Sequence, residues 1–270
     1  DLGTLYYYNT TSCDASGNCN ITGPYNFTTA SNNAPTIDAV TSVSAQDPLP
    51  DAIKNVLVNF TVSDQQGISD LNHSSAHAIF NSSGITRTGN CSNNTIDADT
   101  VTYNCSVPMQ YYDPAGTWTI NVTVIDNSQA SAYNATTDFT YAELFYIVVG
   151  PKAFGFGSLY SGRNGEAAAS NPLLIDNLGN VNLTQINITA YDLVNGSFSI
   201  NVSSITVNVS DGAGGTALQN NTIINIPFAN VTVAAAGVDD NESLYFYIST
   251  PNVLPITYVS SNDWVITADG

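Results

Sequence analysis

Residues 118–124 read Trp-Thr-Ile-Asn-Val-Thr-Val, an alternation of apolar and polar side chains over the whole stretch. A period of two is typical of a β-strand that buries one face and leaves the other in water. Residues 56–62 and 103–107 follow the same pattern, and no strong helical period is visible in the chain. The sequence therefore predicts an all-β protein.

The chain has 270 residues, which favours two domains. The turn-forming residues at 32–35 end a first short segment of the chain. The next segment is predicted to contain seven short strands, which is the number in an immunoglobulin-like (Ig-like) sandwich. We predict two tandem Ig-like β-sandwich domains preceded by an N-terminal β-hairpin. The expected boundaries are 1–33 for the hairpin, 34–141 for the Ig-like β-sandwich and 142–270 for the second β-sandwich.

The predicted strands follow from the turn residues between apolar runs. In the hairpin they are 2–8 and 25–29. In the first sandwich they lie near 36–44, 56–63, 75–81, 101–107, 116–126 and 132–141, with a weak strand at 85–88. In the second they lie near 144–149, 153–160, 173–177, 181–191, 203–210, 222–233, 243–250 and 256–267. The apolar phase slips inside 181–191, which predicts a β-bulge near Thr184-Gln185.

The charge balance excludes several classes of partner. The chain has 22 Asp and Glu against 4 Lys and Arg, a net charge of −18. Nucleic-acid binding requires a basic surface, and so does binding to anionic lipid through basic segments. The longest apolar run is 144–149, which is too short to span a membrane.

Asparagine is the dominant polar residue. The chain has 33 Asn, and 19 of them begin an Asn-x-Ser/Thr triplet, against about 7 expected by chance for the acceptor motif of N-glycosylation. This excess predicts covalent N-linked glycans, and hence an extracellular protein at the cell surface. The alternative reading is that Asn and Thr are simply the polar outward positions of strands. The predicted acceptors are Asn9, Asn20, Asn26, Asn59, Asn72, Asn81, Asn90, Asn93, Asn104, Asn121, Asn134, Asn182, Asn187, Asn195, Asn201, Asn208, Asn220, Asn230 and Asn241.

The four cysteines agree with an oxidising compartment. Their spacing lacks the close pairs and histidine partners of a zinc site. Because each neighbouring pair brackets a turn-like stretch, we predict the disulfides Cys13–Cys19 and Cys91–Cys105 among the three possible connectivities.

Segments covering about a quarter of the chain resemble archaeal cell-surface proteins with Ig-like repeats. Residues 112–127 are similar to the penultimate strand of such repeats, and 13–19 resembles the last hairpin of one. Residues 176–181, and 244–247 followed by Pro255 and Trp264, are similar to sandwich domains of the same kind of protein. The resemblance implies a surface-layer, adhesin or donor-strand filament protein, and it carries over no catalytic residue.

Catalytic chemistry has little support in the sequence, and we expect no enzyme, no metal site and no cofactor. His73 and His77 are four apart, but in a strand this spacing separates them by about 13 Å. Glu occurs only at 143, 166 and 242, which argues against a glycosidase pair. The acidic cluster 239–242 lacks the residue order of a calcium loop and is interpreted as a solvated turn.

These observations predict a structural subunit of a heavily N-glycosylated extracellular filament, assembled by strand exchange between copies of itself. An isolated hairpin is not stable in water, so residues 1–33 pair either with another molecule or with their own sandwich. Alternatives are an S-layer component and an adhesin or carbohydrate-binding surface ectodomain. The predicted subunit contacts are Leu2, Leu5, Tyr6, Tyr7 and Tyr8. They place large side chains on both faces of a strand that has none of the Lys or Pro residues which usually protect an exposed edge.

Overall fold

The computed structural model describes residues 3–233, 241–252, 254 and 256–270. Over these residues every regular element is a β-strand, apart from two short 3-10 turns, η1 (Ile68–Asp70) and η2 (Val202–Ser204). The all-β prediction is therefore confirmed. In the part of the chain described, no helix has the length and apolar character needed to cross a bilayer.

The chain divides into two compact units, which we describe in turn. The first comprises Asp1–Ser44, Asn55–Pro108 and Thr117–Phe139. The second comprises Ala45–Lys54, Met109–Gly116 and Thr140–Gly270.

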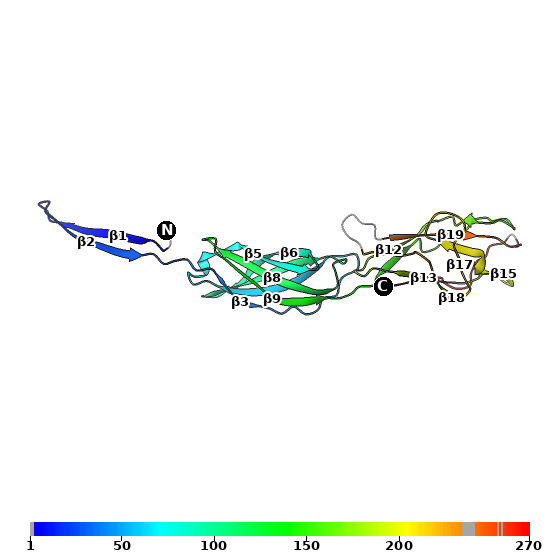
Figure 1. Cartoon of the computed structure of the whole chain (residues 1–270), viewed down its shortest axis with the longest axis horizontal. Helices are drawn as coiled ribbons and strands as arrows, with labels where there is room; N and C mark the ends of the chain where they lie inside the picture. Colours follow the sequence, from blue (N-terminus) through cyan, green and yellow to red (C-terminus); the bar gives the residue numbers. More distant parts are fainter. Residues whose placement is uncertain (1–2, 234–240, 253, 255) are drawn as a thin grey trace. The chain divides into compact units, whose positions relative to one another are not determined.

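The first unit begins with the predicted hairpin. Strands β1 (Leu5–Cys13) and β2 (Cys19–Thr28) pair antiparallel in a two-stranded sheet, visible as two long arrows in Figure 1. Both strands extend further toward the tip than the sequence predicts. The register shifts once, between Tyr8 and Thr10, and the pairing then continues to Cys13 opposite Cys19.

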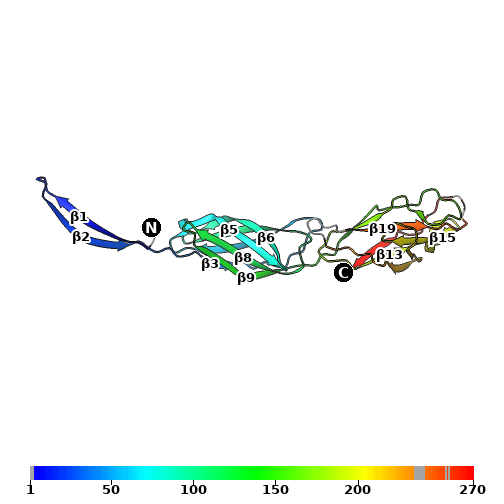
Figure 2. The same ribbon diagram turned by 45° about the horizontal axis from the view of Figure 1, so that its top comes forward.

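Seven further strands form one antiparallel sheet in the order β3-β4-β7-β6-β5-β8-β9. Figures 1 and 2 both show its two end strands, β3 and β9, close together, so the sheet is nearly closed and barrel-like. The strands are β3 (Thr36–Val40), β4 (Lys54–Ser63), β5 (Leu71–Ser82), β6 (Ile85–Ile96), β7 (Thr100–Met109), β8 (Gly116–Asp126) and β9 (Ser131–Tyr141).

The core of this sheet comes from the alternation in the sequence. The apolar positions of 118–124 are fully buried, and so are the alternate positions of β4 and β7. Aromatic rings pair within the core: Phe60 stacks on Tyr103 with centroids 5.1 Å apart, and Phe80 meets Phe139 edge-on at the same distance. Burying each such side chain stabilises the fold by roughly 1.5–3 kcal/mol.

Strand β6 joins the two halves of the sheet. Its first half pairs with β5, up to Asn90 opposite His77, and its second half pairs with β7, from Cys91 opposite Cys105. Gly89 stands at the crossing and is buried. A Cβ atom there would lie 2.1 Å from the carbonyl oxygen of Ser106, so only glycine fits.

The described residues of the second unit form three sheets. The largest has the order β10-β12-β19-β16-β17, with β11 also paired to β19, and two three-stranded sheets have the orders β18-β13-β21 and β15-β14-β20. The strands are β10 (Ile147–Gly150), β11 (Glu166–Ala167), β12 (Leu173–Asn177), β13 (Gln185–Ala190), β14 (Leu193–Asn195), β15 (Phe198–Ile200), β16 (Ile205–Asn208), β17 (Thr216–Ala217), β18 (Thr222–Asn225), β19 (Asn241–Ile248), β20 (Val259–Ser260) and β21 (Val265–Asp269).

One buried cluster is shared by these sheets, including Ile175 of β12, Ile188 of β13 and Phe246 of β19. The predicted strand at 153–160 is wrong, because this segment carries no strand. Its apolar residues Phe154 and Phe156 pack on the cluster from a loop. The predicted bulge at Thr184-Gln185 is replaced by a break: Leu183 bridges to Val231, and β13 begins at Gln185.

Candidate functional site: the exposed hairpin and the glycan-acceptor positions

The hairpin exposes all of its strand residues. Every residue of β1 and β2 is accessible to water, whereas the strands of the seven-stranded sheet alternate between buried and accessible positions. The predicted contact residues Leu5, Tyr6, Tyr7 and Tyr8 lie here and retain between 38% and 66% of their surface. Leu2 lies outside the described residues.

One face of the hairpin is an aromatic cluster. Tyr6 stacks on Phe27 with ring centroids 5.5 Å apart, and Tyr8 lies 5.5 Å from Tyr25. Tyr8 also approaches Phe27, at 6.3 Å. These four rings, which we call the aromatic face, follow from the register, because side chains of directly opposed residues project from the same side of a sheet.

The opposite face carries a predicted glycan acceptor. Asn26 pairs directly with Tyr7, between the two aromatic pairs, so both side chains project away from the aromatic face. Further along, Ser12 is opposite Asn20, another predicted acceptor. A glycan on Asn26 would therefore leave the aromatic face uncovered.

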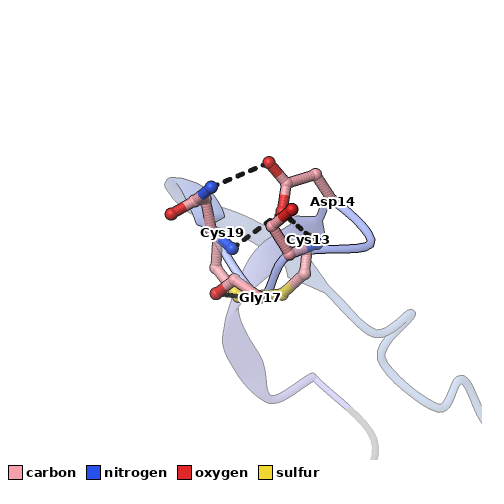
Figure 3. Close-up of a disulfide and its surroundings, with 6 residues drawn as sticks. Cys13, Asp14, Gly17 and Cys19 are labelled. Carbon is pink, nitrogen blue, oxygen red and sulfur yellow. Dashed lines mark hydrogen bonds between the residues drawn. A yellow bond between two sulfur atoms is a disulfide. The ribbon is translucent and has the colours of Figure 1, made fainter.

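The tip of the hairpin is closed by the predicted disulfide Cys13–Cys19, shown in Figure 3. Within the loop, Asp14 accepts hydrogen bonds from the backbone N–H groups of Ser16 and Asn18 and from the Asn18 side chain, each at 2.9 Å. These bonds, the Asn18 side-chain bond foremost, hold the pKa of Asp14 below its ordinary value. The tip is therefore held by the disulfide and by local hydrogen bonds, and not by packing of side chains in a core.

The second predicted disulfide, Cys91–Cys105, is also present. It joins β6 to β7 where β6 changes partner, and Cys105 is buried. Both predicted pairings are therefore confirmed.

The predicted glycan acceptors are all accessible. None of the 19 asparagines is buried, and twelve of them are exposed. The acceptors that are only partly exposed are Asn59, Asn72, Asn104, Asn121, Asn134, Asn187 and Asn208. Among the described residues, the side-chain oxygens of Asn104 and Asn121 are buried without a hydrogen-bond partner.

Asparagines outside the triplets behave differently. The two buried asparagines among the described residues, Asn177 and Asn180, begin no triplet. Asn180 donates to the carbonyl oxygens of Ala142 and Asp113 and accepts from the N–H of Leu144. The buried Asn180 therefore connects loops through its hydrogen bonds, whereas the asparagines that begin a triplet lie at the surface.

The longest gap between predicted acceptor asparagines runs from 135 to 181. This gap includes β10 and the loop before β12. It also exposes large apolar side chains, among them Phe145 (54%), Tyr146 and Tyr160. Among the described residues, β10 is the end strand of its sheet, so a sheet edge lies in the longest segment without a predicted acceptor.

The same unit contains a groove of about 1,060 Å³. Its walls include the aromatic residues Phe154, Phe156, Tyr258 and Trp264. The indole N–H of Trp264 donates to Ser260 Oγ at 2.9 Å, which fixes the ring. Pockets of this size accept small ligands.

The two histidines singled out in the sequence each lie beside another polar group. His73 Nδ1 lies 2.6 Å from the Tyr103 hydroxyl, and His77 Nδ1 lies 2.8 Å from the Ser75 carbonyl oxygen. In the acidic cluster 239–242, Asp239 and Asp240 lie outside the described residues, while Glu242 accepts from the N–H of Asn230. A group of carboxylates that the sequence pattern does not indicate is formed by Asp64, Asp70 and Asp126.

Comparison with known proteins adds no family. Neither a protein-family model nor a curated protein sequence matches this chain.

Proposed function

We propose that this chain is a structural subunit of a heavily N-glycosylated extracellular filament, in which the hairpin of one subunit adds to a sheet of the next. The observation that carries the proposal is the hairpin itself, a two-stranded sheet whose strand residues are all exposed and which bears four large rings on one face. A two-stranded sheet is marginal in water, and open strand edges pair readily with other sheets. Addition to a partner sheet would give the open backbone groups hydrogen-bond partners and would bury the aromatic rings.

The two hairpin faces support one orientation in the partner. The aromatic face would lie against the partner's apolar surface, and the Asn26 face would remain in water with its glycan. This refines the expectation from the sequence that both faces need cover. Each ring offers 150–250 Å² for burial, and each backbone hydrogen bond adds about 0.5–1.5 kcal/mol.

The acceptor that we propose is the edge of β10 in a neighbouring subunit. Support comes from the exposed Phe145 and Tyr146 beside this edge, and from the absence of acceptor triplets between 135 and 181. A contact between two different surfaces of the same chain is heterologous, so it propagates from subunit to subunit instead of closing a dimer. The partner of the chain is then another copy of itself.

The strand order supports the Ig-like assignment within this proposal. The order β3-β4-β7-β6-β5-β8-β9 corresponds to strands A-B-E-D and C-F-G of the constant-type Ig sandwich, with β6 joining the two layers. The chain departs from antibody domains in two ways: Trp118 lies on the sixth strand, and the disulfide joins β6 to β7. The boundaries 34–141 and 142–270 for two sandwiches remain predictions.

A second candidate function is a carbohydrate-binding surface ectodomain. The observation that favours it is the aromatic groove with Trp264, because sugar rings stack on aromatic side chains. Trp264→Ala would then abolish sugar binding in a glycan-array measurement and leave assembly unchanged. An S-layer component would use the same hairpin contact to build a lattice in place of a filament.

Electron microscopy of the purified chain tests the filament proposal. We compare the full chain with a variant that lacks residues 1–28, which removes both hairpin strands and keeps the segment leading to β3. The full chain should form filaments, and the truncated chain should remain monomeric in sedimentation. Both units should unfold at unchanged temperatures, because no residue of the hairpin strands is buried. Filaments formed by the truncated chain would show that the hairpin is not the connector.

A further inference from the structure

Three aspartates meet at one end of the seven-stranded sheet. Asp64 follows β4, Asp70 ends the turn η1, and Asp126 ends β8. One carboxylate oxygen from each lies within 4.8 Å of the other two. In the described part of the chain, they form the one group of three or more His, Cys, Asp or Glu close enough to share a metal ion.

The group is largely withdrawn from water. Asp126 has no exposed surface, and Asp64 and Asp70 are half-buried. The chain as a whole has only four Lys and Arg, so side-chain cations are scarce. Burial raises the pKa of Asp64 above its ordinary value, and the charges of Asp70 and Asp126 raise it further. Three carboxylates held this closely repel one another unless a cation lies between them.

Two oxygen atoms at this place have no hydrogen-bond partner. One oxygen of Asp64 accepts from the Gln66 N–H at 2.7 Å, but the other, Oδ2, is buried and unpaired among the described residues. The side-chain oxygen of Asn32 is likewise buried and unpaired, while its amide nitrogen donates to Asp126 Oδ2 at 2.7 Å. Buried polar atoms without partners are rare and indicate a missing water or ion.

We propose that one Ca²⁺ ion binds between Asp64, Asp70 and Asp126, with the side-chain oxygen of Asn32 as a further ligand. Calcium takes six to eight oxygen ligands at about 2.4 Å, so two ligands on opposite sides of one ion are about 4.8 Å apart. The spacing of the three carboxylates fits this geometry. Water completes the coordination, as in other oxygen-ligand sites.

The ion would fasten the segment between the hairpin and the sheet. Asn32 lies between β2 and β3, and its neighbours are already held by two glutamines of the loop after β4. Asn33 hydrogen-bonds to Gln65 and Gln66, and Gln66 Nε2 donates to the Ser31 carbonyl oxygen at 3.1 Å. Calcium binding would add a bond from Asn32 to three residues of the sheet unit, so that this segment becomes a fixed support for the hairpin.

Calorimetric titration of the full chain with CaCl₂, after treatment with a chelator and below the concentration of assembly, tests the proposal. Binding should saturate at one ion per chain, with a dissociation constant in the range of about 10⁻⁵–10⁻³ M found for sensor and extracellular sites. MgCl₂ should bind at least tenfold more weakly. Calcium at a hundred times its dissociation constant should raise the unfolding temperature of the first unit by roughly 10 °C.

Asp70→Asn separates a binding role from a merely structural one. In chelator this variant should unfold at a higher temperature than the wild type, because one repelling charge is gone, and in calcium at a lower one. Its calcium affinity should fall at least tenfold. The control Asp99→Asn, at an exposed position of the same unit, should behave as the wild type in both conditions. Should Asp70→Asn fail to fold, Asn32→Ala provides a second variant with weakened calcium affinity.

Several results would overturn the assignment. One is the absence of heat and of a thermal shift with calcium up to about 10 mM, ten times the weak limit of extracellular modules. Equal affinities in Asp70→Asn and in the wild type would do the same, and equal binding of magnesium would reject calcium as the ligand. The measurement uses unassembled chain, so its outcome is independent of the filament proposal.

Discussion

Tyr6 and Phe27 stack across the hairpin with their ring planes 19° apart, yet Tyr6 keeps 38% and Phe27 keeps 53% of its surface exposed. The pair thus has the geometry of a packed contact, while a large part of each ring stays open to water. Exposed apolar surface of this kind marks an interaction site. The hairpin register holds the two rings in place before any partner arrives.

The first prediction concerns these two rings. Tyr6→Ser and Phe27→Ser should each raise the critical concentration for assembly about tenfold or more, since burying such a ring contributes roughly 1.5–3 kcal/mol. Sedimentation velocity measures the effect over a concentration series. Tyr133→Ser, which changes an exposed tyrosine on β9, serves as the matched control. If all three variants assemble alike, the aromatic face is not part of the contact.

A second prediction concerns glycan occupancy. The intact mass of the native protein should exceed 28.5 kDa by many sugar units. Peptide mapping should find higher occupancy at exposed positions such as Asn9 and Asn93 than at Asn104 and Asn121, whose side-chain oxygens are buried. A mass equal to that of the bare chain would instead support the reading of Asn and Thr as plain surface residues.

Gly89→Ala should destabilise the first unit by about 3 kcal/mol, because the new methyl group would collide with the Ser106 carbonyl where β6 changes partner. Urea unfolding of the variant provides the measurement. Gly155→Ala is the control, since a Cβ atom there meets open space. A change below about 0.5 kcal/mol at Gly89 would mean that β6 and β7 separate easily at the crossing.

The last prediction is a pH dependence. Burial raises the pKa of Tyr103 to about 12, from 10.0 for an ordinary tyrosine. The unfolded chain therefore loses this proton first, so the stability that Tyr103 contributes is complete below pH 10 and is lost as the pH rises to about 12. Ultraviolet titration should show one tyrosine ionising last, and Tyr103→Phe should remove that part of the alkaline loss. Ionisation of every tyrosine near pH 10 in the folded state would contradict this.

The sequence predicts strands well where one face is buried. The predicted strand 116–126 agrees with β8 (Gly116–Asp126), because the apolar side chains at 118, 120, 122 and 124 alternate with polar ones and enter the core. Strand β6 is predicted only at 85–88 but extends to Ile96, and its second half is polar and mostly exposed. Backbone pairing with β7 and the disulfide Cys91–Cys105 hold that half, and neither leaves an apolar pattern in the sequence.

Two other features lie beyond pattern reasoning. Phe154 and Phe156 alternate as a strand would, but they fill the core from a loop. Asp126 is distant in sequence from Asp64 and Asp70, and the three aspartates meet because the ends of β4 and β8 and the turn η1 lie together. The proximity of the three carboxylates becomes clear only from the order and direction of the strands. An Asp directly after a strand, as at Asp64, is the signal that could have suggested it.

The nearly closed sheet also bears on mechanical strength. Gln46, which follows β3 in the chain, forms a parallel bridge with Tyr141 at the end of β9, through bonds from Gln46 N–H to the Thr140 carbonyl and from Ala142 N–H to the Gln46 carbonyl, both 2.9 Å. A pull on the two ends of the chain draws these parallel segments in opposite directions along their length. Both bonds must then break together in shear, whereas bonds that unzip break one after another. A thread built from such subunits would therefore resist stretching at this bridge before its β-sheets lose their order.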